Sequence, residues 1–457
     1  ACKRGDEIIL PRNVHRSVLN ALVLCGAVPV YVNPEVDNRL GISLGMKREQ
    51  VAKAIAEHPN AVAVLVNLGV LVYFKYANFL IDTLNQIGHF GIAALNIGAV
   101  LPLGISYYIF KIISYEADVY TGKIKPEKNF LTFAVYVLFF PQLIVGPIVK
   151  YREMADQLHD GQNRCTLAKA QQGAELFVFG LAKKVILADS IGALWTDIIG
   201  AGGVGLANVS TPLAWLGIIA YSLQLYFDFA GYSEMSNGLA ALLGFDCPAN
   251  FNLPYISGSI TEFWRRWHMS LGSWFRDYVY IPMGGNRVAP ARRYLNILVV
   301  WMLTGLWHGA DWNFVLWGLF FAVFLILEKG FLLKPLQKLP VLSHLYTLLL
   351  VAVSFVIFDS AGLSEAAAHL SRMFGAGGVP LATGEALYYL GSYAVTFIIA
   401  IIGATPYPTR WMNRLSEGPK TGRVLAVAAP VALMALLAVV TAYLVDGSFN
   451  PFLYFRF

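Results

Sequence analysis

Hydrophobic and polar positions follow two different patterns along the chain, and the change falls near residue 61. Before this point, short apolar runs alternate with charged stretches. The pattern predicts strands at Glu7–Leu10 and Val28–Val32, a helix at Asn13–Cys25 between them, and a further candidate strand at Ala61–Val66. Alternating strands and helices are typical of parallel βαβ units, so the first 60 residues are predicted to be a short α/β fragment of soluble type.

After residue 61 the chain consists of long apolar runs separated by short charged loops. An α-helix needs about 20 mainly apolar residues to cross the hydrocarbon core of a bilayer. We therefore expect an all-α polytopic membrane protein behind the α/β fragment. The candidate spans are residues 61–81, 90–113, 130–149, 173–193, 211–229, 295–307, 313–333, 341–358, 385–404 and 422–446.

One polar interruption lies inside an apolar stretch, at His308-Gly309-Ala310-Asp311. Neither flanking run reaches the length of a span by itself, which predicts that His308 and Asp311 lie at membrane depth. Ionisable side chains are costly there and indicate a functional site. The alternative is a re-entrant or surface loop between two short core helices.

The composition agrees with a membrane protein. Apolar residues make up 57% of the chain and charged residues 14%, whereas soluble domains carry about 25% charged residues. The mean hydropathy is +0.57. The net charge of +6 comes from short basic loops, as in cytoplasmic loops of membrane proteins, and does not indicate a nucleic-acid partner.

A second concentration of candidate residues lies at Ser259–Leu271. Ser259 and Glu262 have the spacing of a capping box, which predicts that a helix begins there. His268 lies on this predicted helix, which has basic residues at Arg265 and Arg276. Aromatic residues recur on one face of it, at Phe263, Trp267, Trp274 and Tyr278. From the spacing alone, a membrane-surface anchor with a hydrogen-bonded histidine explains this split.

Other polar positions carry weaker signals. Asp228 lies in an apolar stretch and needs a partner, for which an Arg or the Ser233–Glu234 turn is a candidate. Structural pairing is the favoured role. The four cysteines have neither metal-ligand nor disulfide-framework spacing, and no nucleotide-binding or zinc-protease motif is found. We expect no bound metal or cofactor.

The first 60 residues resemble the bacterial ornithine/lysine/arginine decarboxylases, which use pyridoxal phosphate. The resemblance rests on Lys3-Arg4-Gly5-Asp6, Pro11-Arg12-Asn13-Val14-His15-Arg16-Ser17 and Pro29-Val30-Tyr31-Val32-Asn33-Pro34. In that family the histidine that matches His15 stacks on the cofactor. This chain lacks the Schiff-base lysine and the aspartate that pairs with the pyridine nitrogen, so the fragment at residues 1–60 is expected to be non-functional.

Residues 61–457 resemble the membrane-bound O-acyltransferase family, and within it the alginate O-acetyltransferase branch. The strings that carry the resemblance are Phe263-Trp264-Arg265-Arg266-Trp267-His268, Trp274-Phe275-Arg276-Asp277-Tyr278, Gly284-Gly285-Asn286-Arg287 and Gly305-Leu306-Trp307-His308-Gly309-Ala310. The resemblance implies a helical bundle around a tunnel. It also implies that His308 is the catalytic histidine and His268 the second signature histidine. Family members typically begin with one or more further transmembrane helices, which this domain is expected to lack.

The resemblance further implies transfer of an acyl group, with acetyl as the leading expectation, from a thioester such as acetyl-CoA to hydroxyls of an exported polysaccharide or cell-wall polymer. It implies a multi-pass protein of the bacterial inner membrane and an extracytoplasmic acetyltransferase partner. The alternatives are D-alanyl transfer to teichoic acid, a transporter, and an inactive chimera. A transporter would predict paired broken helices, and only one clearly interrupted segment is found.

The residues agree with this chemistry. Transfer to an alcohol needs a base near the attacking hydroxyl, and a neutral imidazole serves near physiological pH. We therefore expect His308 to be the general base, with His268 positioning donor or acceptor. Trp307 or Asn313 is a candidate hydrogen-bond donor for the oxyanion. Asp311 lies three residues after His308, so the two are predicted to share a helix face, with Asp311 orienting the imidazole.

Overall fold

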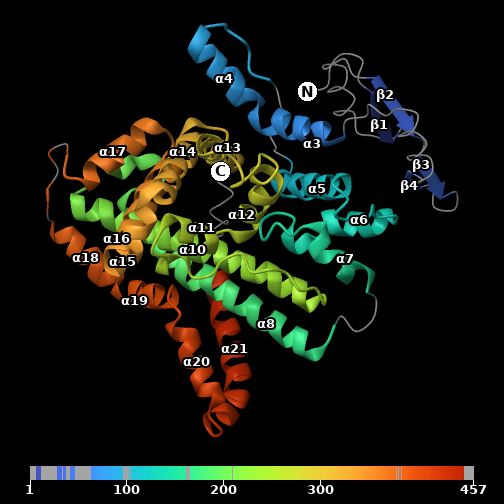
Figure 1. Ribbon diagram of the computed structural model, residues 1–457. Coiled ribbons are helices and arrows are strands. Elements are labelled where there is room, and N and C mark those ends of the chain that lie inside the picture. The colour runs from blue at the N-terminus through green and yellow to red at the C-terminus, as the bar shows by residue number, and fades with distance from the viewer. Residues whose placement is uncertain are drawn as a thin grey trace. The chain divides into compact units, whose positions relative to one another are not determined.

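The computed structural model describes residues 7–11, 28–32, 34–37, 42–46, 63–95, 102, 104–160, 165–207, 209–376, 378, 380, 381 and 383–446. The chain forms two compact units (Figure 1). One comprises Ala1–Ile144 and Lys150–Gly161, and the other Val145–Val149 and Gln162–Phe457.

The first unit begins with two pairs of short strands. β1 (Glu7–Pro11) and β2 (Val28–Val32) pair in parallel, which confirms the two predicted strands. The helix predicted between them, Asn13–Cys25, lies outside the described residues, as does His15. β3 (Pro34–Asp37) and β4 (Ile42–Met46) form an antiparallel pair that the hydrophobic pattern did not predict.

The first helices of this unit correct one prediction. α3 (Ala63–Leu71) continues through η1 (Val72–Tyr76) into α4 (Ala77–Gly88), so a strand at Ala61–Val66 is wrong. The apolar run continues without a break to helical length, and a helix satisfies its own backbone groups. The unit is completed by α5 (Ile105–Tyr120), α6 (Phe130–Val137), η2 (Phe140–Gln142) and α7 (Tyr151–His159).

No helix follows the whole predicted span 130–149. α6 ends at Val137, and the chain then passes through a short 3₁₀ turn that contains Pro141. Gly146 has a positive φ of 137°, and Pro147 follows it. Proline removes a backbone donor and Gly146 adopts a backbone conformation outside the helical range, so this apolar stretch is irregular beyond α6.

The second unit is built on two long helical segments that pack side by side (Figure 1). One runs through α8 (Leu167–Ala182), η3 (Lys183–Ala188) and α9 (Asp189–Ile198). The other is α10 (Thr211–Leu242), which extends well beyond the predicted span 211–229.

Glycines explain how closely α8 and α10 approach. A Cβ added at Gly180 would lie 2.5 Å from the carbonyl oxygen of Gly231, and one added at Gly173 would lie 2.7 Å from that of Gly238. Each helix thus presents two glycines seven residues apart, and small residues allow membrane helices to pack backbone to backbone.

The remaining helices follow in order around α10. They are η4 (Ala201–Ala207), η5 (Pro254–Ile256), α11 (Ile260–Arg266), α12 (Met269–Phe275), η6 (Arg276–Tyr280), α13 (Pro290–His308), α14 (Trp312–Leu327), η7 (Glu328–Leu332), α15 (Leu333–Lys338), α16 (Pro340–Asp359), α17 (Leu363–Met373), α18 (Gly384–Ser392), α19 (Ala394–Gly403), α20 (Tyr407–Glu417) and α21 (Thr421–Asp446).

Four helices of the described part are long and apolar enough to cross a membrane: α10, the continuous Trp312–Lys338, α16 and α21. The pair α18 and α19 would be a fifth span, although it bends by 61° at the break. These elements confirm an all-α polytopic membrane protein. Of the other predicted spans, 295–307 forms part of α13 but does not pass the same test of length and hydropathy.

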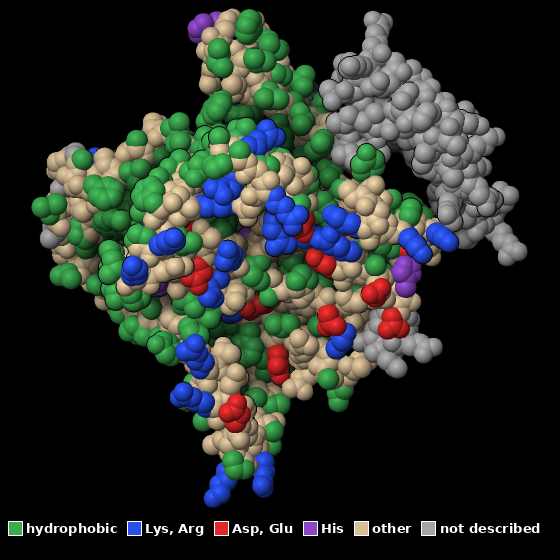
Figure 2. Space-filling model, viewed as in Figure 1, with side chains coloured by type: hydrophobic (Ala, Val, Ile, Leu, Met, Phe, Trp, Pro, Cys, Tyr) green, Lys and Arg blue, Asp and Glu red, His purple; other side chains and the backbone are tan. Residues whose placement is uncertain are grey.

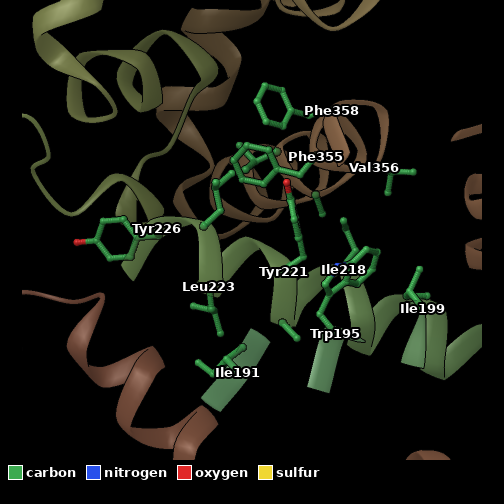
Figure 3. Close-up of a cluster of buried hydrophobic side chains, with 14 of the residues drawn as sticks. Ile191, Trp195, Ile199, Ile218, Tyr221, Leu223, Tyr226, Phe355, Val356 and Phe358 are labelled. Carbon is green, nitrogen blue, oxygen red and sulfur yellow. The ribbon is translucent and has the colours of Figure 1, made fainter. Parts of the chain in front are cut away.

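The core of the second unit lies between α9, α10 and α16 (Figure 3). Trp195, Tyr221 and Phe355 are almost fully buried and point toward one another there. Burying a large apolar side chain contributes about 1.5–3 kcal/mol, so this cluster fixes α10 against its neighbours.

The outer helices expose apolar surface instead. Figure 2 shows apolar side chains over much of the visible face and basic side chains at the free end of the α20–α21 hairpin. In α21 the side chains of Val424, Val427 and Val431 are about two-thirds exposed or more, at 66%, 72% and 66%. An apolar helix with a basic end is typical of a lipid-facing span.

Candidate functional site

His308 is the last residue of α13, at a sharp turn into α14. Gly309 is extended and ends the helix, and α14 begins after Asp311. The two helices cross at a glycine pair: a Cβ at Gly305 would lie 2.2 Å from the carbonyl oxygen of Phe314, and one at Gly318 would lie 2.2 Å from that of Trp301. This close crossing holds the imidazole of His308 inside the bundle, where it is 6% exposed.

Aromatic rings surround the imidazole of His308. Its ring centroid lies 5.0 Å from that of Trp307, 5.0 Å from that of Trp317 and 5.4 Å from that of Phe358, all in edge-to-face geometry. Phe358 belongs to α16, so three helices contribute to the surroundings of this histidine (Figure 3 shows Phe358).

Asp311 does not share a helix face with His308, because the helix ends between them. Its side chain is exposed and accepts a hydrogen bond from the backbone N–H of Trp312, as an N-cap of α14. The prediction that the two residues lie on one face is therefore wrong. The cap satisfies an orphan donor at the start of α14, which explains an aspartate at this position without a role in the chemistry.

His268 also lies at a break, where the sequence predicted one continuous helix. The capping residue Ser259 is confirmed, since its Oγ accepts from the backbone N–H of Glu262 at 3.0 Å. α11 nevertheless ends at Arg266, and His268 has φ 43° and ψ 53° before α12 begins. A non-glycine residue in this left-handed region costs about 1–3 kcal/mol, which marks the position as one that the fold enforces.

Asn250 holds this break in place from a distant loop. Its backbone oxygen accepts from the N–H of Met269 at 2.9 Å. Its Oδ1 lies 3.2 Å from the backbone N of Ser270, 2.9 Å from Ser270 Oγ and 3.2 Å from His268 Nδ1. The start of α12 is thus capped by Asn250 rather than by continuation of α11.

His268 is 1% exposed, and burial lowers its pKa to about 3. Its imidazole is therefore neutral at physiological pH. Its ring packs edge-on against Phe229 of α10, with the centroids 4.8 Å apart.

Trp307 connects the two histidines. The centroid of its ring system lies 5.9 Å from the imidazole of His268 and 5.0 Å from that of His308. Two positions 40 residues apart in the sequence therefore contact one buried indole. The structure brings together the three predicted residues His268, Trp307 and His308.

Glu328 supports this arrangement and was missed by the sequence analysis. Its carboxylate is 1% exposed and accepts from the backbone N–H groups of Ile260 and Thr261 at 2.7 and 2.8 Å. The hydroxyl of Thr261 donates to it at 2.6 Å. A carboxylate at a helix N-terminus satisfies orphan donors and interacts favourably with the helix dipole, so Glu328 fixes the start of α11. Its charge inside an apolar segment was the available signal.

The remaining candidates make contacts of their own. Asp228 is buried and pairs with Lys184 at 2.8 Å, which fits the favoured structural role with a lysine as partner. Asn313 donates to the carbonyl oxygen of Ser360 at 2.8 Å and so ties α14 to the end of α16. Arg265 is exposed. Arg276, also exposed, pairs with its neighbour Asp277 at 2.9 Å.

The Gly284–Arg287 turn is a structural element. Gly284 and Gly285 have φ values of 99° and 54°, which suit glycine. Asn286 accepts hydrogen bonds from Tyr280 and from Lys329, and so connects the turn to η7. In the part of the chain that the structure describes, no group of His, Cys, Asp and Glu could hold a metal ion.

Two protein families match parts of this chain. The model of the membrane-bound O-acyltransferase family matches residues 124–358, which include both histidines. The chain belongs to this family and is an acyltransferase. The model of the Orn/Lys/Arg decarboxylase major domain matches residues 1–95, and so extends past residue 60.

Several curated relatives are similar over most of the chain. The protein named probable alginate O-acetylase AlgI of Azotobacter vinelandii is 38% identical, over 86% of this chain and 84% of its own length. A peptidoglycan O-acetyltransferase of Helicobacter pylori is 34% identical over 69% of this chain and 64% of its own. A teichoic acid D-alanyltransferase of Streptococcus thermophilus is 30% identical over 56% of this chain and 68% of its own.

Proposed function

We propose that the chain transfers an acetyl group from a thioester to hydroxyl groups of an exported polysaccharide, with His308 as the general base. The observation that carries the proposal is the pair of buried histidines on one indole ring, in a chain whose relatives are named O-acetylases and O-acetyltransferases.

The chemistry needs few groups. The acceptor hydroxyl attacks the thioester carbonyl carbon while His308 takes the hydroxyl proton. A carbon–oxygen bond forms, the carbon–sulfur bond breaks, and the imidazolium returns its proton to the leaving thiolate. The aromatic surroundings of His308 exclude water, which would otherwise compete with the acceptor for the acyl group. Trp307, next to His308, remains our candidate donor to the oxyanion, whereas the Asn313 amide is engaged by Ser360.

The proposal extends to the setting of the enzyme. We take acetyl-CoA as the first donor to test, with no bound cofactor, and the bacterial inner membrane as the location. An extracytoplasmic acetyltransferase would then complete the transfer to the polymer.

The experiment measures transfer of labelled acetyl from acetyl-CoA in membranes that contain the full chain. His308→Ala is expected to lower the rate by roughly 10²–10⁴-fold, the usual contribution of a general base. His159→Ala is the matched control, because His159 is exposed at the end of α7. Full activity of a His308→Ala protein that inserts at normal levels would overturn the assignment.

D-alanyl transfer is the second candidate, because a teichoic acid D-alanyltransferase is among the relatives. The same membranes supplied with a D-alanyl thioester distinguish the two: transfer of D-alanine without transfer of acetyl would favour the second candidate.

We also propose that residues 61–457 carry the activity and that residues 1–60 take no part in it. All the proposed catalytic and supporting residues lie between Asp228 and Glu328. His15→Ala is expected to leave the transfer rate unchanged, and a loss comparable to that of His308→Ala would contradict this division.

A further inference from the structure

We infer that Asn250 is a positioning residue that holds His268 as its Nδ1–H tautomer, so that Nε2 is a neutral hydrogen-bond acceptor for an O–H or N–H group of a substrate. The inference deepens the proposed function and rests on it for the identity of the substrates.

The orientation of the Asn250 amide follows from its partners. One of its terminal atoms lies 3.2 Å from the backbone nitrogen of Ser270. A backbone N–H only donates, so the atom that faces it is the amide oxygen. The amide nitrogen lies 3.2 Å from Ser233 Oγ, which can accept.

The tautomer of His268 follows from that orientation. Its Nδ1 lies 3.2 Å from the same amide oxygen, which has no proton to give. The proton of this hydrogen bond must therefore be on Nδ1. A neutral imidazole carries one N–H, so Nε2 presents its lone pair.

Nε2 is buried, yet it has no hydrogen-bond partner among the residues that the structure describes. Buried polar atoms normally have a partner, and an orphan needs an explanation. The His268 ring packs against Phe229 and Trp307, and the Trp307 indole also contacts His308. The ring that carries the orphan acceptor is thus separated from the proposed base by one shared indole, and its residue has a strained backbone conformation.

The lone pair on Nε2 of His268 binds a hydrogen-bond donor and disfavours a negatively charged group such as a carboxylate or phosphate. Two groups of the reaction fit: a hydroxyl of the acceptor sugar, and an amide N–H of the thioester's pantetheine arm.

Charged groups nearby have partners of their own. Asp228, next to Phe229, pairs with Lys184, and Arg266 pairs with Glu262. His308 is the titratable group that lies across Trp307. Ser233, Ser270 and Asn250 are not titratable in this range.

The first test observes the tautomer directly and needs no activity. ¹⁵N-histidine NMR of the full chain in detergent, with His268→Gln to assign the signal, is expected to show a protonated Nδ1 and an unprotonated Nε2. The opposite tautomer would overturn the inference, whether or not the chain transfers acetyl.

The second test uses Asn250→Asp, which keeps the acceptor oxygen and adds a negative charge. A carboxylate beside an imidazole favours its protonated form and raises its pKa by about 1–3 units. Protonation removes the Nε2 lone pair, so the ¹⁵N signals of His268 should titrate at a pH at least about one unit higher than in the unchanged protein. An unchanged titration of these signals would mean that Asn250 only supports the fold.

The third test separates the two substrate groups. Asn250→Leu removes the amide oxygen that fixes the tautomer of His268. It is expected to raise the KM for the acceptor or for the thioester by about 10-fold, as loss of a hydrogen bond does. The substrate whose KM rises is the one that donates to Nε2. Ser270→Ala is the matched control: it removes one donor to the same oxygen but leaves the His268 contact, and both KM values should change by less than about 3-fold. Equal KM values in Asn250→Leu and the unchanged protein would contradict the inference.

Discussion

The two buried histidines are held in different ways. His268 is fixed by the hydrogen bond between its Nδ1 and the amide oxygen of Asn250 in another loop, at a break between two short helices. His308 ends a long helix and is enclosed by the rings of Trp307, Trp317 and Phe358. A hydrogen-bond partner determines which ring nitrogen carries the proton, whereas aromatic neighbours determine position and exclude water.

This difference fits a division of roles in the proposed reaction. A residue that binds a substrate group benefits from one fixed tautomer. A general base must take up and release a proton within each turnover, so a setting that fixes its place and leaves water outside is more useful.

The largest effect is expected from Glu328→Ala, which destabilises the segment that carries His268. The change leaves two backbone N–H groups and one hydroxyl of α11 without their buried acceptor, and each orphan costs about 1–3 kcal/mol. We expect a loss of about 3 kcal/mol in the free energy of unfolding, measured by thermal unfolding in detergent. Glu328→Gln retains one acceptor oxygen and should lose less; equal stability of Glu328→Ala and the unchanged protein would show that α11 does not depend on this cap.

The next largest effect is expected from low pH, which should lower the free energy of unfolding through protonation of His268. The unfolded chain has a histidine pKa of about 6.5, and burial lowers the pKa of His268 to about 3 in the folded protein. Between these values the unfolded state binds more protons, so stability falls as the pH drops below about 6.5, by up to ~1.4 kcal/mol per pH unit.

Thermal unfolding at pH 7, 6 and 5 measures this dependence. His268→Gln removes the titrating group and should show a shallower decline than the unchanged protein. If the two declines are the same, the histidine is not the buried neutral group that the structure describes.

The smallest effect is expected on the His308 side, from Asp311→Ala. Loss of a helix N-cap costs about 1 kcal/mol of stability. Asp311 is exposed and accepts a hydrogen bond from the α14 backbone. The rate of transfer should therefore change by less than about 5-fold, the factor that corresponds to about 1 kcal/mol. Acetyl transfer and thermal unfolding are both measured. A loss of rate close to that of His308→Ala would instead place Asp311 on the imidazole.

Local signals in the sequence predicted much of this molecule. Apolar length located α10, α14, α16 and α21, and Ser259 predicted the start of α11. The polar interruption at residue 308 and the family motifs identified the two histidines, which the structure brings to one indole.

The missed features depend on contacts between distant segments. The break at His268 is imposed by Asn250, which bonds to Ser270 twenty residues later in the chain. The aromatic spacing of residues 263–278 suits a continuous helix, and nothing local signals the interruption. Likewise, the partner of Glu328 is the start of a helix 67 or 68 residues earlier. Tertiary contacts override local propensity at both positions.

The glycines of α8 and α10 have a mechanical consequence. With Gly180 against Gly231 and Gly173 against Gly238, the two backbones touch and leave no space for a lipid chain between them. Under a force that pulls α10 out of the bilayer, α8 loses this contact surface unless it moves with α10. We expect α8 and α10 to be extracted together, in a single step.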